Sequence, residues 1–288
     1  MPTIHSHISD LRAALQTYRV AQRIALVPTM GNLHDGHLEL VKIAKQHADI
    51  VVVSIFVNPT QFGIGEDFDS YPRTLDEDVA KLATVGADYV FAPTIDEMYP
   101  LLPPPTTILA GAITKQLCGK TRPTHFDGVG IVVSKLFNIV QPDVAIFGQK
   151  DYQQLAIIKQ LVRDLSYPIE IIGAPIIRAA DGLALSSRNQ YLSASERRIA
   201  PILQQELQYL AKQIGAVQQP LDVLLSASRE RITSAGFIID YLEVKTTELT
   251  AVNDESIHNH QGLVILVAAW LGRARLLDNL LVTIGKVR

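Results

Sequence analysis

The segment Ile24-Ala-Leu-Val-Pro-Thr-Met-Gly-Asn-Leu-His-Asp-Gly-His37 joins an apolar run to a glycine-containing turn and then to a helical pattern. The run Ile24–Thr29 predicts a strand, and the pattern over His37–His47 predicts a helix. The next run, Ile50–Val57, is continuously apolar and β-branched, which is typical of a strand buried on both faces. This part of the chain therefore predicts a β–α–β unit of a parallel sheet.

The same alternation continues to about residue 175. Further strands are predicted at Tyr89–Ala92, Val144–Phe147 and Ile169–Ile172. Helices are predicted after the capping box Thr74-Leu-Asp-Glu77, from about Val129, and from Asp151. We therefore predict an α/β fold, namely a Rossmann-like, doubly wound parallel sheet that binds its ligand at the carboxyl ends of the strands.

The pattern changes after Gly173. A second capping box, Ser193-Ala-Ser-Glu196, predicts one long helix to about Ile214, and Pro220 begins another helix to about Ala235. Three strands are then predicted, at Phe237–Lys245, Leu263–Ala269 and Leu276–Val282. We expect two domains, residues 1–175 and a smaller α+β domain of residues 176–288.

The composition limits the classes of partner. Apolar residues make up 48% of the 288, and the net charge at pH 7 is −3, without the basic surplus of proteins that bind nucleic acid or membrane surfaces. The single cysteine, Cys118, cannot form an intrachain disulfide, and the longest apolar run, residues 263–271, is shorter than the ~20 residues of a membrane-spanning helix. We therefore expect a soluble cytoplasmic protein with no nucleic-acid and no membrane partner.

The motif His34-Asp-Gly-His37 lies where a predicted strand turns into a predicted helix. Two histidines three residues apart share a face of a helix, and a helix N-terminus attracts anions. Gly36 allows a ligand to approach the backbone closely. By itself the pair is also compatible with two exposed histidines or with half of a zinc site, but the strand–turn–helix context favours phosphate binding.

Other polar segments follow predicted strands or turns. Gly148-Gln-Lys-Asp151 comes directly after a strand, and its Lys150 offers a compact cation for phosphate oxygens. Leu185-Ser-Ser-Arg188 offers hydroxyl and guanidinium donors, although by itself it is also compatible with a solvated connector. The amides of Gln61 and Gln154 could bind hydroxyl or carboxylate groups.

Six segments in order carry a resemblance to a known family: Pro28–His37, Val57-Asn-Pro-Thr-Gln-Phe62, Tyr71-Pro-Arg-Thr74, Arg122-Pro-Thr-His-Phe-Asp-Gly128, Gly148-Gln-Lys-Asp151 and Asp181-Gly-Leu-Ala-Leu-Ser-Ser-Arg-Asn189. The chain resembles the pantothenate synthetase family, which belongs to the nucleotidyltransferases that carry H-x-G-H. The resemblance extends from about Pro28 to Asn189. The family usually has Glu at the position of Gln149, and this departure leaves the role of that side chain open.

The resemblance implies an ATP-dependent, AMP-forming ligase that condenses (R)-pantoate with β-alanine through a pantoyl-adenylate and releases pyrophosphate. It implies that His37 donates a proton, beside the donors His34, Lys150 and Arg188, and that Gln61 and Gln154 bind the substrates. The ATP contacts that it implies are Met30, Gly31, Asn32, Leu33, His34, Asp35, Gly36, His37, Gly148, Gln149, Lys150, Asp151, Ile177 through its backbone, Leu185, Ser186, Ser187 and Arg188. It also implies that ATP and pantoate bind the domain of residues 1–175, that Mg²⁺ is required and that the protein is a homodimer. Arg122 and His125 match a segment near the substrates, and neither their roles nor the magnesium ligands can be predicted.

Two other functions are compatible with parts of this pattern. A nucleotidyltransferase that stops at a nucleotidyl product would use the same histidines but would not need Gln61 and Gln154 for a second substrate. A regulatory module with a vestigial nucleotide site would not be expected to keep His34, His37, Lys150 and Arg188 together. We therefore expect the ligase.

Overall fold

The computed structural model describes residues 1–216, 219–254, 257 and 262–283, and the chain divides into two compact units. The first unit contains Met1–Gln149 and Gln153–Pro175, and the second contains Lys150–Tyr152 and Ile176–Arg288. The predicted boundary between residues 175 and 176 places Lys150–Tyr152 in the first unit. In the structure this segment groups with the second unit.

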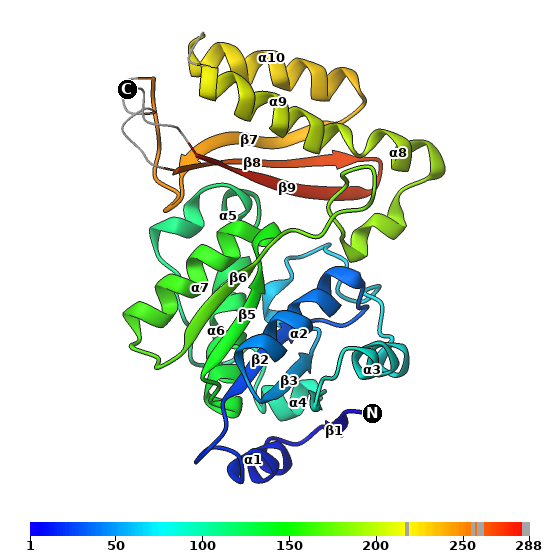
Figure 1. The fold of residues 1–288 in the computed structure, drawn as a ribbon, viewed down its shortest axis with the longest axis vertical. Helices are drawn as coiled ribbons and strands as arrows, with labels where there is room; N and C mark the ends of the chain where they lie inside the picture. Colours follow the sequence, from blue (N-terminus) through cyan, green and yellow to red (C-terminus); the bar gives the residue numbers. More distant parts are fainter. Residues whose placement is uncertain (217–218, 255–256, 258–261, 284–288) are drawn as a thin grey trace. The chain divides into compact units, whose positions relative to one another are not determined.

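The first unit is built on a six-stranded parallel sheet with the strand order β1-β4-β3-β2-β5-β6 (Figure 1). Its strands are β1 (Thr3–His5), β2 (Ile24–Thr29), β3 (Ile50–Ile55), β4 (Tyr89–Phe91), β5 (Val144–Gly148) and β6 (Glu170–Ala174). From the central strand β2 the chain first builds outward through β3 to β4 and later returns to place β5 on the other side of β2. The strand order therefore reverses between β2 and β5, and such a point is where doubly wound sheets bind ligands.

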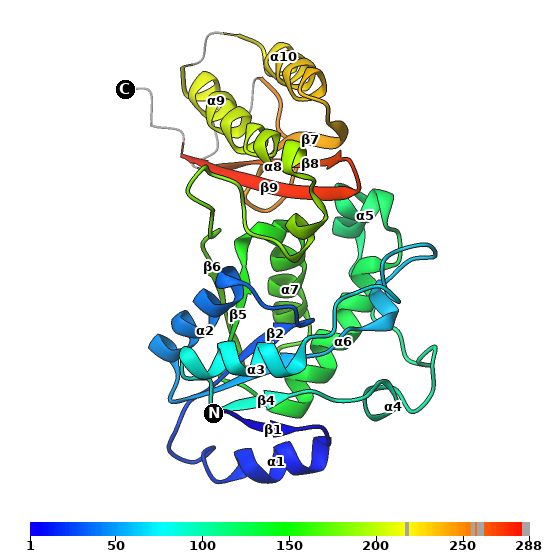
Figure 2. The same ribbon diagram turned by 90° about the vertical axis from the view of Figure 1, so that its right-hand side faces the viewer.

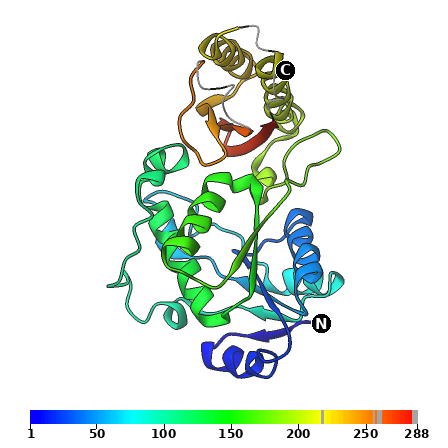
Figure 3. The same ribbon diagram turned by 60° about the vertical axis from the view of Figure 1, so that its left-hand side comes forward.

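Helices cover both faces of this sheet. Alternate strand residues such as Val27 and Val53 pack with Leu40 of α2 and Leu82 of α3, whereas Phe147 contacts Phe137 of α6 on the opposite face. Figures 2 and 3 show α2 and α7 on opposite sides of the strands. The helices of this unit are α1 (Ile8–Gln16), α2 (Asp35–His47), α3 (Leu75–Thr84), α4 (Ile95–Met98), α5 (Cys118–Thr121), α6 (His125–Val140) and α7 (Tyr152–Asp164), whose first residue groups with the second unit. The predicted doubly wound α/β fold is confirmed.

The second unit contains an antiparallel sheet in the order β7-β8-β9. Its elements are α8 (Ala194–Ile199), α9 (Ile202–Ala216), α10 (Leu221–Ser234), β7 (Ile238–Thr246), β8 (Gly262–Leu271) and β9 (Ala274–Thr283). Leu207 and Leu210 of α9 and Ile232 of α10 share a buried apolar cluster with Ile265 and Val267 of β8. The two helices therefore cover one face of the sheet, and the predicted α+β character is confirmed.

Several predicted boundaries were wrong for local reasons. The helix predicted from Ser193 to Ile214 is two helices, because Pro201 has no N–H to continue the first. The capping box predicted at Thr74 does not form, since the Thr74 hydroxyl donates to Asp78 Oδ2 instead of capping α3. The capping box at Ser193 and Glu196 does form. The strand β1 and the helix α1 were not predicted.

Candidate active site

The segment that follows β2 lies at the carboxyl edge of the sheet, beside the point where the strand order reverses. It begins at Met30 and ends at His34, which is the N-cap of α2. The helix therefore begins at Asp35, two residues earlier than predicted. The N-terminus of α2 and the side chains of His34 and His37 lie together at this edge.

The two histidines form a reciprocal cap of α2. The Gly36 N–H donates to His34 Nδ1 at 3.1 Å, and the His34 N–H donates to His37 Nδ1 at 3.3 Å. The ring centroids are 4.1 Å apart. Because each Nδ1 accepts a backbone proton, a neutral ring in this position carries its own proton on Nε2. The rings lie side by side as predicted, although His34 precedes the helix as its N-cap, and each neutral ring is a donor through Nε2.

The loop before His34 is held by α3. Gly31 and Asn32 both have positive φ, 83° and 51°. Asp78 of α3 accepts from the Asn32 N–H at 2.9 Å and from the Leu33 N–H at 2.7 Å. The Leu33 side chain is buried in the core of the unit. The ATP contacts predicted for these loop residues stay a prediction.

Gln61 reaches this loop from η1 (Pro59–Gln61), and its Nε2 donates to Met30 Sδ at 3.1 Å. The orientation of its amide follows from Asn58, which is almost fully buried. Asn58 Oδ1 accepts from the Thr60 N–H, so Asn58 Nδ2 must be the atom that donates to Gln61 Oε1 at 3.1 Å. This fixes the Gln61 Nε2 end of the amide as the donor end, which suits an acceptor such as a carboxylate.

A buried tyrosine supports this arrangement. The Tyr99 hydroxyl donates to Asn58 Oδ1 at 3.0 Å, since that oxygen can only accept. Burial raises the pKa of Tyr99, although a side-chain hydrogen bond involving Thr60 partly offsets this. The hydroxyl therefore remains a donor at neutral pH. Asn58 and Tyr99 were not predicted; Asn58 lies within the quoted motif, but the tyrosine that supports it is 41 residues away.

Arg122 and His125 lie behind Gln61. His125 Nδ1 donates to the Gln61 carbonyl oxygen at 2.8 Å, and Arg122 donates to the same oxygen at 3.3 Å. Arg122 also forms two hydrogen bonds of 2.6 Å with the Glu66 carboxylate. Burial opposes ionisation of Glu66, but the hydrogen bonds and charge of Arg122 outweigh it and lower the pKa of Glu66. These residues hold the backbone of Gln61 in place.

The end of β5 contributes Gly148 and Gln149 to the same edge. Gln149 Nε2 donates to the carbonyl oxygen of Gly173 in β6 at 3.2 Å. A glutamate at this position could not make that bond when ionised, so the amide has a structural role here. Gln154, the other predicted substrate residue of the first unit, lies half-buried in the first turn of α7.

Lys150 and Asp151 belong to the second unit. Lys150 Nζ is 3.0 Å from Asp151 Oδ2, and the Lys150 carbonyl oxygen accepts from Asn279 Nδ2 of β9 at 3.0 Å. Beside Asn279, Asp278 forms two hydrogen bonds with the Arg178 guanidinium, at 2.6 and 2.8 Å. Asn279 therefore fixes the backbone of a predicted phosphate-binding lysine and Asp278 holds Arg178, and neither role was predicted from the sequence.

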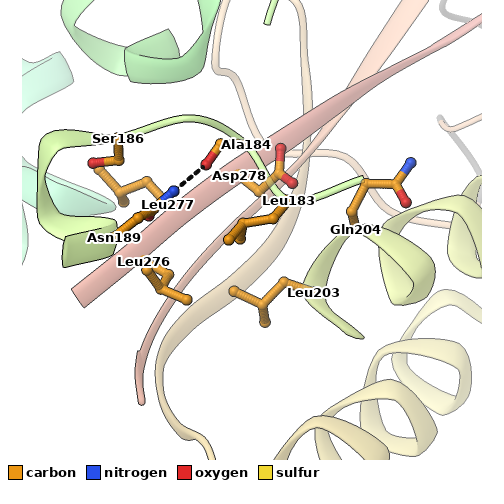
Figure 4. A pocket seen from close by; sticks show the side chains of 9 residues that line it. All are labelled: Leu183, Ala184, Ser186, Asn189, Leu203, Gln204, Leu276, Leu277 and Asp278. Carbon is orange, nitrogen blue, oxygen red and sulfur yellow. Dashed lines mark hydrogen bonds between the residues drawn. The ribbon is translucent and has the colours of Figure 1, made fainter. Parts of the chain in front are cut away.

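The predicted phosphate loop lies in the second unit after a narrow turn. The Leu185 N–H donates to the Ile177 carbonyl oxygen at 2.9 Å, and Ser186 caps η4 (Ser187–Tyr191) through the Arg188 N–H. A small pocket lies against this loop, and Figure 4 shows Ser186 and Asn189 in its wall. Its volume of about 10 Å³ is near that of one water molecule, so it is not a nucleotide pocket.

Neither a metal cage nor a membrane segment is found in residues 1–216, 219–254, 257 and 262–283. No three or more His, Cys, Asp or Glu side chains there gather in a way that could hold a metal ion. Within the same ranges, no helix is both long and apolar enough to cross a bilayer.

The fold and this edge of the sheet define a class of protein. A doubly wound parallel sheet carries an H-x-G-H helix cap directly after its central strand, next to an amide oriented as a donor. These features are those of a Rossmann-like α/β enzyme that acts on anionic substrates.

Comparison with known proteins identifies the family within this class. A sequence model of pantoate-beta-alanine ligase matches residues 3–281. Pantothenate synthetase of Psychrobacter cryohalolentis is 88% identical over 287 residues, 100% of both chains, and that of Acinetobacter baylyi is 55% identical over 95% of this chain and 96% of its own. The chain belongs to the pantoate–β-alanine ligase family, and it is an enzyme that forms a carbon–nitrogen bond between pantoate and β-alanine.

Solved structures agree with this assignment. The crystal structure of pantothenate synthetase from Thermus thermophilus is 43% identical, has a TM-score of 0.89 and covers 96% of this chain and 98% of its own. Pantoate-beta-alanine ligase from Francisella tularensis, solved in complex with β-γ ATP and β-alanine, is 35% identical with a TM-score of 0.79, covering 98% of both chains. The expected ligase, rather than a simple nucleotidyltransferase or a regulatory module, is confirmed.

Proposed function

We propose that the chain joins pantoate to β-alanine in two steps, with ATP activating the pantoate carboxylate. In the first step a carboxylate oxygen bonds to the α-phosphorus of ATP, the bond from that phosphorus to the bridging oxygen of pyrophosphate breaks, and pyrophosphate leaves. In the second step the amine of β-alanine attacks the acyl carbon, loses a proton, and AMP leaves with the bonding electron pair. The products are pantothenate and AMP.

The observation that carries this proposal is the reciprocal cap of His34 and His37 at the N-terminus of α2. The attacking carboxylate and the triphosphate repel each other, so the site must supply hydrogen-bond donors and positive potential. Two imidazoles that accept backbone protons on Nδ1 can present Nε2 donors next to a helix N-terminus. We assign proton donation to the α-phosphate region to His37 and support to His34.

The other predicted residues fit the same scheme. We propose that Lys150 and Arg188 supply cations to the phosphates and that Gln61 binds the carboxylates of pantoate and β-alanine. The donor orientation of the Gln61 amide supports this role, because a carboxylate is an acceptor. Gln154 is assigned to pantoate. Met30–His37, Gly148–Asp151, Ile177 and Leu185–Arg188 are assigned to ATP.

We also propose that the reaction requires Mg²⁺, that the protein is cytoplasmic and that it forms a homodimer. Mg²⁺ is commonly held by substrate phosphates with one or two carboxylates rather than by a protein cage, and the described residues contain no such cage. We therefore assign the ion to the triphosphate of ATP. The single cysteine, Cys118, supports a reducing location.

The proposal is tested by incubating the purified chain with pantoate, β-alanine and ATP in the presence of Mg²⁺. We expect AMP, pyrophosphate and pantothenate in equal amounts. The release of ADP and phosphate, or no AMP above a control without enzyme, would contradict the proposal.

A further inference from the structure

We propose that Asp78 is a positioning residue, which fixes the loop Gly31–Leu33 and thereby the His34 and His37 rings. This inference rests on the proposed function, in which these rings bind ATP. Asp78 lies in the first turn and a half of α3 and has no exposed surface, whereas its neighbours Asp76 and Glu77 are exposed. A helix-dipole role explains the two exposed acids but not a buried one.

The contacts of Asp78 are directed at the loop. Oδ2 accepts from the Asn32 N–H at 2.9 Å and from the Thr74 hydroxyl at 3.1 Å, and Oδ1 accepts from the Leu33 N–H at 2.7 Å. A carboxylate can accept on both oxygens, and hydrogen bonds to a charged acceptor are stronger than those between neutral groups. Two consecutive backbone N–H groups therefore bind one buried carboxylate.

The loop is shaped to make this possible. Gly31 has φ +83° and Asn32 φ +51°, so the chain turns its amides toward α3. A Cβ atom on Gly31 would lie 3.1 Å from Asp78 Oδ2 and 3.1 Å from Ile55 Cγ2. Glycine is therefore favoured here by its backbone conformation, and a larger residue would also crowd Asp78.

A second residue of α3 also forms a hydrogen bond with the loop. Lys81, one turn after Asp78, donates from Nζ to the Leu33 carbonyl oxygen at 2.8 Å. Asp78 and Lys81 thus bind the N–H and the C=O of the same residue, which leaves little freedom of rotation about it. Leu33 is directly followed by His34, whose N–H forms half of the histidine cap.

The position of the loop determines which nitrogen of each histidine ring carries the proton. The cap holds only while the His34 N–H points at His37 Nδ1, and that direction is set by the peptide between Leu33 and His34. In Asp78→Asn one carboxylate oxygen becomes an NH₂ group, which cannot accept from a backbone N–H. One loop amide then loses its partner, and we expect the Leu33–His34 peptide to become mobile.

The test is ¹⁵N NMR of the histidine rings in the substrate-free protein, with signals assigned from His34→Gln and His37→Gln spectra. The wild type should show both rings with the proton on Nε2, and Asp78→Asn should show a mixture of tautomers. Its KM for ATP should rise about tenfold or more, as expected for the loss of a charge-assisted hydrogen bond, with the KM for β-alanine unchanged. Asp76→Asn, the matched loss of an exposed acid from the same helix turn, should match the wild type.

Two outcomes would overturn the proposal: a folded Asp78→Asn with wild-type tautomers and wild-type KM for ATP, or an equal change in Asp76→Asn. If Asp78→Asn does not fold, Lys81→Met decides, because it removes one loop contact from a partly exposed position. It should then raise the KM for ATP, and an unchanged KM together with unchanged tautomers contradicts the proposal. The histidine tautomers are measured without ATP and do not depend on activity. A wild type without ligase activity would therefore refute the proposed function, whereas the positioning of the rings by Asp78 would still be tested by the tautomers.

Discussion

At the scale of single residues, the histidine pair joins local structure to chemistry. Each ring is used twice, once as a helix cap through Nδ1 and once as a candidate donor through Nε2. The cap sets the orientation of the rings, so in the proposed mechanism they need no reorganisation when charge develops on the phosphate.

We predict that His37→Ala folds normally but loses adenylate formation. Removing one preorganised donor to a developing anion is expected to lower the rate by on the order of 10²–10³. Single-turnover formation of pantoyl-adenylate measures this, with circular dichroism to check the fold. The control is His47→Ala, the loss of an exposed histidine from the last turn of the same helix. Near-normal turnover in His37→Ala would remove this residue from the mechanism.

Tyr99→Phe tests the orientation of the Gln61 amide. The variant keeps the buried ring but removes the hydroxyl that donates to Asn58 Oδ1. We expect a stability loss of about 1 kcal/mol, typical of one hydrogen bond, and a higher KM for pantoate. Tyr18→Phe, which removes a hydroxyl bond to Tyr89 elsewhere in the first unit, should lose similar stability at an unchanged KM. An equal KM effect in both variants would contradict a specific role for Tyr99.

The candidate site residues could be predicted from the sequence, but the residues that hold them in position could not. His34, His37 and Gln61 stand out because their spacing and their position after strands have a chemical meaning. Asn58, Tyr99 and Asp78 each also depend on a partner between 41 and 70 residues away. A weak signal existed for Asp78, which lies four residues before the buried Leu82 on the apolar face of α3.

At the scale of elements, ion pairs join segments that the chain separates widely. The Arg122–Glu66 pair links the segment after η1 to the approach to α6, behind Gln61. Because the pKa of Glu66 is lowered in the folded state, its stabilising contribution is present above the ordinary glutamate pKa of about 4.3. That contribution is lost as the pH falls through the lowered value.

We therefore predict that Glu66→Gln is less stable than the wild type at pH 7 and that the difference shrinks below about pH 4.3. Thermal unfolding between pH 7 and pH 3 measures it. Glu170→Gln is the matched control, since the Glu170–Arg23 pair is exposed and should contribute little. A stability difference for Glu66→Gln that stays constant over this range would be incompatible with the pair.

An ion pair between Arg178 and Asp278 joins β9 to the turn that contains Arg178. Asp278 is almost fully buried and pairs with Arg178, which is 22% exposed. Asp278→Ala leaves the guanidinium without its partner, and we expect a loss of about 3 kcal/mol in the free energy of unfolding. The double variant Arg178→Met with Asp278→Leu should lose less, because no charge is left unpaired. Urea unfolding measures the loss of stability in both variants. Equal losses would contradict a penalty for leaving the Arg178 charge unpaired.

Element types could be predicted from the sequence better than element ends. The parallel strands β2 to β6 were found because they are apolar runs of the expected length, and their order then placed H-x-G-H at the edge where ligands bind, whereas the short edge strand β1 was missed. The ends depended on single contacts, such as His34 capping α2 and Thr74 bonding to Asp78 instead of its own helix. The break at Pro201 was visible in the sequence, but the helical periodicity on both sides masked it.

At the scale of the whole molecule, each of the two units has its own apolar cluster. The candidate residues are divided between the units: the histidines and Gln61 belong to the first, and Lys150 and Arg188 to the second. A net charge of −3 shows that a few placed donors, rather than bulk charge, would have to bind the polyanionic substrate.

In the proposed mechanism ATP activates pantoate before β-alanine takes part. The most direct measurement is exchange of labelled pyrophosphate into ATP with pantoate present and β-alanine omitted. We predict exchange that depends on pantoate and is lost in His37→Ala. Exchange that requires β-alanine, or no exchange in an enzyme that makes pantothenate, would contradict an adenylate formed at the histidine pair.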